Sequence, residues 1–251
     1  MTERPSIILV HGAFSRASHC NALAAYFTTA GFDCLTPSLP GHDPSDAALL
    51  SRLSLDDYLA ALEPIRSALS IPPILIGHSM GGLLAQHLAA TGACSALVCL
   101  ASAPPGMLPA QLQAVPYLAP LFPRILVGRS IHPPAATFRF LALHDLPAAE
   151  QDDLMSSLGA ESGRAYRSMI MGTSRVRASD VRCPVLCVSA SEDRIISRRV
   201  ARGVAAHYGA DHQVLQGRGH WLLARAGLER VGRPVLEWLD ERQLGSARAA
   251  V

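Results

Sequence analysis

Charged and aromatic residues are scarce in this 251-residue chain, at 17% and 5% of the sequence. The 22 basic residues nearly balance the 20 acidic ones, which leaves a formal net charge of +2 at pH 7. Proteins that bind the phosphate backbone of nucleic acids need a much larger excess of positive charge. The composition therefore argues against a nucleic acid partner. The apolar fraction of 49% instead predicts an ordinary globular protein with a sizeable core.

Long apolar runs and metal-binding cysteine patterns are also missing. No apolar stretch reaches the roughly 20 residues that a membrane-spanning helix needs, so we expect no membrane span. The six cysteines show none of the spacings typical of zinc sites or redox pairs, so we expect neither a metal nor another cofactor. Residues 1–6 lack the charged-then-apolar layout of a signal peptide, which predicts a cytoplasmic location.

Short apolar runs alternate with segments of helical periodicity along most of the chain. This alternation is typical of an α/β fold, and we expect a mainly parallel sheet of about six strands flanked by helices. The predicted strands are residues 6–10, 32–36, 73–77, 96–101, 184–190 and 212–215. The predicted helices are residues 21–29, 55–69, 80–90 and 198–208, and a region 222–242 in which Pro234 starts or kinks the second half.

The alternation breaks between residues 104 and 182, a segment that is rich in proline and contains no clear strand. We interpret it as a helical cap inserted after the fourth predicted strand. Its helices are expected around residues 110–118, 134–143 and 148–158, separated by Pro120, Pro123, Pro133 and Pro147. Residues 1–103 and 183–244 would then form the core, and residues 245–251 a loose tail.

A serine stands at a sharp turn between the third predicted strand and the helix that follows it. The sequence there is Gly77-His78-Ser79-Met80-Gly81. A strand-to-helix turn of this kind strains the backbone of the serine and leaves room only for very small neighbours, here the two glycines. It also puts the serine at the amino end of a helix, where free amide groups face a developing negative charge. Ser79 is therefore the candidate nucleophile, and the N–H of Met80 is a candidate oxyanion donor.

A serine nucleophile needs a base to remove its proton and a carboxylate to orient that base. Active groups of parallel sheets gather at the carboxyl ends of the strands. His220 follows the last predicted strand through a glycine-rich turn, and Asp193 follows the fifth. Glu192, adjacent to Asp193, is the alternative acid. We therefore predict a catalytic triad of Ser79, Asp193 and His220.

The first predicted strand ends in His11-Gly12-Ala13-Phe14, whose small residues allow the backbone to approach a bound carbonyl closely. The N–H of Ala13, or alternatively that of Phe14, is the expected second oxyanion donor. His11 and His78 flank glycine turns, and we interpret both as structural histidines.

Together these segments resemble the α/β-hydrolase superfamily. The likeness spans about residues 6–239 and is carried by His11-Gly12-Ala13-Phe14, Leu39-Pro40-Gly41-His42, Gly77-His78-Ser79-Met80-Gly81-Gly82, Asp193 and Gly219-His220. The resemblance implies that Ser79, Asp193 and His220 form the triad. It also implies that Met80, with Ala13 or Phe14, forms the oxyanion hole. The order Ser, Asp, His along the chain is the order found in this superfamily.

Because the first predicted strand starts so close to residue 1, the chain is similar to the compact plant esterase and hydroxynitrile lyase branch. Hydroxynitrile lyases of that branch carry threonine where this chain has Gly12 and lysine where it has Trp221, which argues against cyanohydrin cleavage. Dehalogenases and epoxide hydrolases carry aspartate at the nucleophile position, so Ser79 argues against both.

Apolar residues of the predicted cap are candidates for a substrate pocket, among them Tyr117, Phe122, Phe138 and Phe140. We expect a carboxylesterase-like serine hydrolase that cleaves a carboxylic ester, lactone or thioester of a small hydrophobic substrate through an acyl-enzyme on Ser79. Two alternatives stay open. One is a non-hydrolytic enzyme such as a lyase, cyclase or cofactor-free oxygenase, and the other is a small-ligand-binding protein with a vestigial triad. The sequence specifies no oligomeric state.

Overall fold

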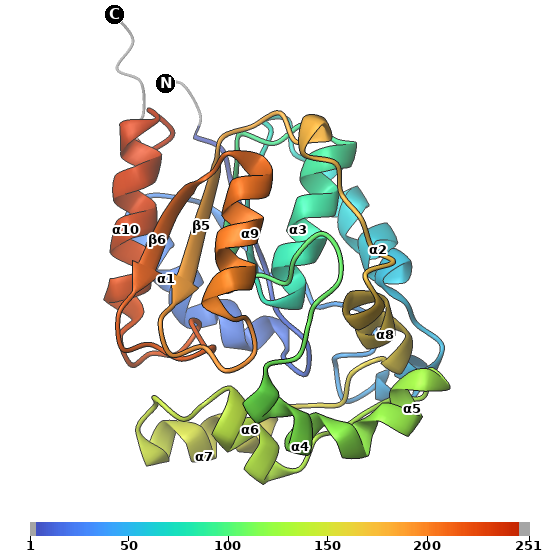
Figure 1. Cartoon of the computed structure of the whole chain (residues 1–251). Coiled ribbons are helices and arrows are strands. Elements are labelled where there is room, and N and C mark those ends of the chain that lie inside the picture. Colours follow the sequence, from blue (N-terminus) through green and yellow to red (C-terminus); the bar gives the residue numbers. More distant parts are fainter. Residues whose placement is uncertain (1–3, 246–251) are drawn as a thin grey trace, which may run out of the picture.

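The structure is a computed structural model that describes residues 4–245 of the chain. Within these residues six strands form one sheet in the order β2-β1-β3-β4-β5-β6, and every neighbouring pair is parallel. The strands are β1 (Ile7–Val10), β2 (Cys34–Leu35), β3 (Ile74–His78), β4 (Ala96–Leu100), β5 (Val185–Ala190) and β6 (Asp211–Leu215). The prediction of a mainly parallel sheet flanked by helices is therefore confirmed (Figure 1).

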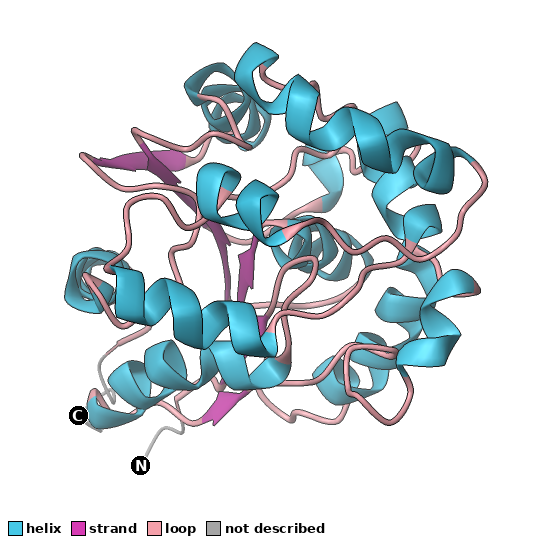
Figure 2. Cartoon of the chain, turned by 90° about the horizontal axis from the view of Figure 1, so that it is seen from below, coloured by secondary structure: helices cyan, strands magenta, loops and turns pink. Residues whose placement is uncertain are grey.

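Helices cover both faces of the sheet (Figure 2). One face packs against α1 (Asn21–Thr29) and α10 (Leu228–Glu241), and the other against α2 (Leu55–Ser67), α3 (Met80–Thr91) and α9 (Arg198–Tyr208). Strand side chains alternate between the two faces, so Ile7 and Leu9 pack with the first group and Ile8 and Val10 with the second. Because both faces are buried, strands such as β1 are apolar throughout, which made them recognisable in the sequence.

The segment between β4 and β5, called the cap segment below and spanning residues 104–182, contains the helices α4 to α8. Their bounds are α4 (Val115–Leu118), α5 (Phe122–Leu126), α6 (Ala135–Leu141), α7 (Ala148–Ser157) and α8 (Gly163–Met171). Helices α4 to α7 lie beyond the carboxyl ends of the strands, and α8 lies beside α2 (Figure 1). Short 3-10 helices occur at Ala17–Cys20, Ala47–Ser51, Leu112–Ala114, Ala119–Leu121 and Ala178–Asp180.

The cap segment differs from the prediction in its details. The helix expected at residues 110–118 is shorter, because a 3-10 turn precedes the four residues of α4. Helices α5 and α8 were not predicted. Pro123 lies in the first turn of α5, where its missing N–H has no helical acceptor and costs little. Pro123 therefore begins a helix instead of separating two.

The last helix also differs, because α10 begins at Leu228 and not near residue 222. Pro234 lies inside α10 and does not start a separate helix. The lost hydrogen bond is offset by a buried face that includes Val231, Val235 and Trp238. Of the predicted tail, residues 246–251 lie outside the described residues. No helix in the described part of the chain is long and apolar enough to span a membrane.

Candidate active site

Ser79 lies at the turn between β3 and α3, where its backbone adopts φ of 55° and ψ of −118°. A positive φ is strained for a residue with a side chain and persists only where the surroundings enforce it. The close packing of the turn enforces the positive φ of Ser79. A Cβ atom on Gly77 would overlap the backbone of Gly81, and one on Gly81 would overlap the backbone oxygens of Val10 and His11. Both positions therefore require glycine.

Replacing Gly81 by valine is expected to lower the free energy of unfolding by about 3 kcal/mol or more, because the new side chain overlaps the end of β1. Gly203→Val is the matched control, since Gly203 also lies in a helix and a Cβ atom there meets nothing within 4 Å. Urea unfolding of both variants measures the difference. Equal stability of the two variants would contradict the packing of this turn.

Ser79, His220 and Asp193 form one chain of hydrogen bonds. Nε2 of His220 lies 3.0 Å from Oγ of Ser79, and Nδ1 of His220 lies 2.8 Å from Oδ2 of Asp193. The other carboxylate oxygen, Oδ1, accepts the backbone N–H groups of Ile195 and Ile196, each at 2.8 Å. These bonds fix the carboxylate, which can hold the imidazole as its Nδ1–H tautomer and leave Nε2 free to accept the serine proton.

The alternative acid, Glu192, does not take part in this chain. Its side chain is exposed, and its only hydrogen-bond partner among the described side chains is the hydroxyl of Ser191 at 3.5 Å. Asp193 is instead 7% exposed and directly faces the imidazole of His220. The geometry therefore favours Asp193 over Glu192.

The loop after β1 passes directly against the candidate nucleophile, because a Cβ atom on Gly12 would come within 3.0 Å of the Cβ atom of that serine. Ala13 lines the cavity beside it. The N–H of Phe14 instead donates to Oε2 of Glu161 at 3.4 Å. Met80 is the first residue of α3, so its N–H has no acceptor within the helix. The geometry favours Ala13 and Met80 over Phe14 as oxyanion donors.

Glu161 is a buried carboxylate of the cap segment that the sequence analysis did not single out. Its Oε1 accepts the hydroxyl of Tyr58 at 2.7 Å and the N–H of Ser162 at 2.6 Å. Its Oε2 accepts Nε2–H of His42 at 2.9 Å as well as the N–H of Phe14. Four donors therefore converge on one carboxylate. Glu161 joins the cap segment to α2 and to the loop that borders the nucleophile.

His42 is the ionic partner of Glu161 in this cluster. Burial lowers the pKa of His42, but the negative charge of Glu161, the hydrogen bond to that carboxylate and the backbone hydrogen bonds to Pro40 and Leu39 together outweigh burial and hold the pKa above its usual value. The hydrogen bonds agree with a charged ring, because Nδ1 of His42 faces the carbonyl oxygen of Pro40 at 3.1 Å while Nε2 faces the carboxylate. Both nitrogens can donate only when the ring is protonated.

Glu161→Gln is expected to lower the free energy of unfolding by about 3 kcal/mol, because the amide NH2 group must face two of the four donors. It should also lower kcat, since the loop through Phe14 loses its anchor. Tyr58→Phe is the comparison. It removes one donor but leaves the other three on the carboxylate, so it should lower the free energy of unfolding by only about 1 kcal/mol. Urea unfolding and ester turnover measure both. If Glu161→Gln costs no more stability than Tyr58→Phe, the cluster does not anchor the loop.

His11 and His78 brace the backbone on either side of the nucleophile. Nε2–H of His78 donates to the carbonyl oxygen of His220 at 2.9 Å. Nδ1 of His11 lies 3.0 Å from the carbonyl oxygen of Gly12, and its Nε2 accepts the N–H of Leu39 at 3.2 Å. Burial lowers the pKa of each of these two histidines to about 3. Both rings are therefore neutral at pH 7, in agreement with their structural interpretation.

The protein is expected to lose stability as the pH falls from 6.5 towards 3. In this window the unfolded chain protonates His11 and His78, whose ordinary pKa is 6.5, but the folded protein keeps them neutral. Each contributes a loss of up to about 1.4 kcal/mol per pH unit. The raised pKa of His42 affects stability only above pH 6.5. Urea unfolding at several pH values should show the slope, and His78→Gln should reduce it. A flat profile below pH 6.5 would contradict buried neutral rings.

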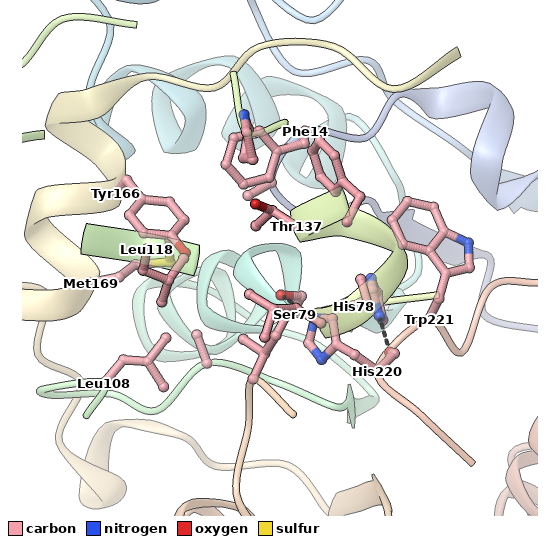
Figure 3. Close-up of a pocket in the computed structure, with 17 residues that line it drawn as sticks. Phe14, His78, Ser79, Leu108, Leu118, Thr137, Tyr166, Met169, His220 and Trp221 are labelled. Carbon is pink, nitrogen blue, oxygen red and sulfur yellow. Dashed lines mark hydrogen bonds between the residues drawn. The ribbon is translucent and has the colours of Figure 1, made fainter. Parts of the chain in front are cut away.

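Ser79 and His220 border a cavity between the sheet and the cap segment, with an empty volume of about 670 Å³ including its mouth. Its walls are mostly hydrocarbon, and none of its lining residues is Asp, Glu, Lys or Arg. Figure 3 shows Leu108, Leu118 and Met169 around it. The cavity therefore fits an uncharged, largely apolar molecule.

Of the four aromatic residues predicted to line this cavity, only Phe138 does so. Tyr117 and Phe140 stack on each other with ring centroids 4.4 Å apart, and Phe122 is 48% exposed. The structure thus corrects the prediction for these three residues. Phe138 and Leu141 share the cavity face of α6, whereas Phe140, two residues after Phe138, points to another side of the helix.

Some residues that line the cavity belong to no sequence motif and were not predicted. Thr137 lies on α6, and Tyr166 lies on α8, a helix that was not predicted. Trp221 had a usable signal, because it directly follows His220 and must lie near the site. In the described part of the chain, no group of three or more His, Cys, Asp or Glu side chains is arranged to hold a metal ion.

Comparison with known proteins defines the class. Residues 7–231 match the family model described as the alpha/beta hydrolase family. The chain therefore belongs to the α/β-hydrolase family, as its sequence pattern implied.

Individual relatives resemble this chain either over a short stretch of sequence or in their overall fold. The chain is 35% identical over 85 residues to the pyrethroid hydrolase of Sphingobium wenxiniae, a match that covers 32% of this chain and only 30% of that protein. The methylesterase MES16 from Arabidopsis superposes with a TM-score of 0.75 and 17% identity, over 94% of this chain and 99% of that one. An extracellular α/β-hydrolase from Paenibacillus reaches a TM-score of 0.76 at 16% identity, over 93% and 98% of the two chains. At such identities the structural likeness shows the fold alone.

Proposed function

We propose that the protein is a serine hydrolase that cleaves carboxylic esters of small hydrophobic molecules through an acyl-enzyme on Ser79. The observation that carries the proposal is the hydrogen-bonded chain of Ser79, His220 and Asp193 beside an apolar cavity. Two relatives are named as a pyrethroid hydrolase and a methylesterase, which supports ester cleavage. Lactones and thioesters present the same acyl carbon and belong to the same proposal.

In the first half of the reaction, Oγ of Ser79 attacks the acyl carbon while Nε2 of His220 takes its proton. The negative charge that develops on the carbonyl oxygen is stabilised by the N–H groups of Ala13 and Met80 and by the amino end of α3. Asp193 stabilises the imidazolium that forms on His220. The imidazolium then protonates the leaving alcohol, which departs and leaves the acyl group on Ser79.

In the second half, His220 takes a proton from a water molecule that attacks the acyl carbon. The same two N–H groups stabilise the second oxyanion. Collapse of this intermediate returns the proton to Ser79 and releases the carboxylic acid. Because the cavity offers the acid no positive side chain, its apolar walls favour departure of the charged product.

Labelling with a fluorophosphonate tests the nucleophile. We expect one equivalent of label on Ser79, none in Ser79→Ala, and normal labelling in Ser67→Ala, a control whose side chain is exposed. Turnover of p-nitrophenyl esters of increasing acyl length then tests the reaction. Full ester turnover in Ser79→Ala would overturn the acyl-enzyme. Labelling without turnover of any ester, lactone or thioester would overturn hydrolysis and favour the lyase, cyclase or oxygenase alternative.

A further inference from the structure

The cavity contains polar groups that the proposed reaction does not use. Ser79 and His220 belong to the hydrogen-bonded chain, and Nε2 of His78 is committed to the carbonyl oxygen of His220. The indole nitrogen of Trp221 points away from the cavity (Figure 3). Nδ1 of His78 and Nε1 of Trp221 have no partner among the described residues, but both atoms are fully buried and not open to the cavity. The hydroxyl groups of Thr137 and Tyr166 are the remaining side-chain polar groups among the lining residues.

Thr137 places a hydroxyl group within an apolar wall. Its side chain lies on α6, is 6% exposed and turns its oxygen towards the cavity (Figure 3). Within residues 4–245 no side-chain or backbone group forms a hydrogen bond with that hydroxyl. The oxygen is open to the cavity, since it is not among the fully buried polar atoms that lack a partner. The hydroxyl is therefore free to form a hydrogen bond with a molecule bound in the cavity, which valine of the same shape could not do.

Tyr166 supplies a second hydroxyl group from α8, a different helix of the cap segment. Its ring packs against Phe14 with centroids 5.8 Å apart, which fixes the ring and directs the phenol into the cavity (Figure 3). No hydrogen bond joins this hydroxyl to another described residue. Burial, together with the nearby charge of Glu161, raises the pKa of Tyr166 to about 12. The phenol therefore stays protonated and remains a donor throughout the neutral and mildly alkaline range.

We propose that Thr137 and Tyr166 form a polar subsite that binds an uncharged oxygen acceptor, an ether or ketone oxygen, in the part of the substrate remote from the scissile ester. Both residues can donate a hydrogen bond to such an oxygen. A carboxylate fits poorly, because no cationic side chain lines the cavity. The substrate class is thus a neutral, mostly apolar ester that carries one such oxygen. This inference rests on the proposed function, since the oxygen is positioned by the ester bound at Ser79.

A scan of matched substrates tests the subsite. The substrates are p-nitrophenyl heptanoate and analogues in which one methylene at successive positions is replaced by an ether oxygen or a ketone carbonyl. The readout is the ratio of kcat/KM for each analogue to kcat/KM for the hydrocarbon ester. We expect the native protein to prefer the oxygen at one position by about 3- to 10-fold, the range of one neutral hydrogen bond.

Three variants assign the preference to the two hydroxyls. Thr137→Val and Tyr166→Phe remove them with little change of side-chain shape, so each should reduce the ratio towards one. The ratio compares two substrates of the same variant, so a general change in kcat/KM cancels. Thr137→Ser keeps a hydroxyl and should keep the preference. No preference at any position, or one that survives in both Thr137→Val and Tyr166→Phe, would overturn the subsite and leave ester hydrolysis standing. Failure of the native protein to cleave any of the esters would overturn both proposals.

Discussion

Replacing His220 by alanine is expected to lower kcat for ester hydrolysis by roughly 10⁴- to 10⁶-fold. His220 is the imidazole within hydrogen-bond distance of Ser79, at 3.0 Å, and no other described group contacts that hydroxyl as a base. Without it the serine keeps its proton and is a weak nucleophile. Because the two residues act as one unit, the double variant Ser79→Ala/His220→Ala should be no slower than either single variant.

His212→Ala is the matched control for this change. His212 lies on β6, close in sequence to His220, but its Nε2 contacts Oγ of Ser189 at 2.8 Å and not the site. Its removal should change kcat by less than about threefold. Steady-state kinetics with one p-nitrophenyl ester measures all the variants, and circular dichroism checks that each is folded. A folded His220→Ala protein within tenfold of native kcat would contradict the role of the imidazole as base.

Asp193→Asn is expected to lower kcat by about 10⁴-fold with little loss of stability. Oδ1 can keep accepting the N–H groups of Ile195 and Ile196, which turns the new NH2 group towards Nδ1 of His220. Nδ1 must then accept a hydrogen bond, so the imidazole carries its proton on Nε2. In that tautomer the ring cannot take the proton of Ser79.

Glu192→Gln tests which of the two neighbouring carboxylates, Asp193 or Glu192, orients His220. Glu192 is exposed and forms no hydrogen bond with His220, so its amide variant should keep kcat within about threefold of native. Rate measurements across pH 6 to 9 for both variants test this. A large loss in Glu192→Gln with a small loss in Asp193→Asn would reverse the assignment.

The sheet could be predicted because its residues are constrained by local pattern alone. Strands buried on both faces must be apolar, and each of the six predicted runs overlaps a strand of the sheet. The shortest, β2, spans only Cys34–Leu35 within the five-residue run that was predicted. The bounds of α1 and α9 agree with prediction. The cap segment was predicted less well, because its helices α4, α5 and α6 have seven residues or fewer and carry little periodicity.

The candidate nucleophile, base and acid were named from the sequence, and the structure brings them within hydrogen-bond distance of one another. The sequence named Ala13 as the expected second oxyanion donor and Phe14 as the alternative. The physical reason that disfavours Phe14 was not available from the sequence, because the N–H of Phe14 donates to Glu161, about 150 residues further along the chain. The division into core and cap domains, the cytoplasmic location and the absence of a cofactor stay predictions.

By itself the sequence determined the parallel sheet, the strained turn at Ser79 and the order of the three reactive residues, because each follows from local backbone chemistry. Only the tertiary structure decided the cluster around Glu161 and the two hydroxyl groups, of Thr137 and Tyr166, that face the cavity. Those features depend on which faces of separate helices meet, and helix packing is set by the whole set of neighbouring side chains and not by a motif.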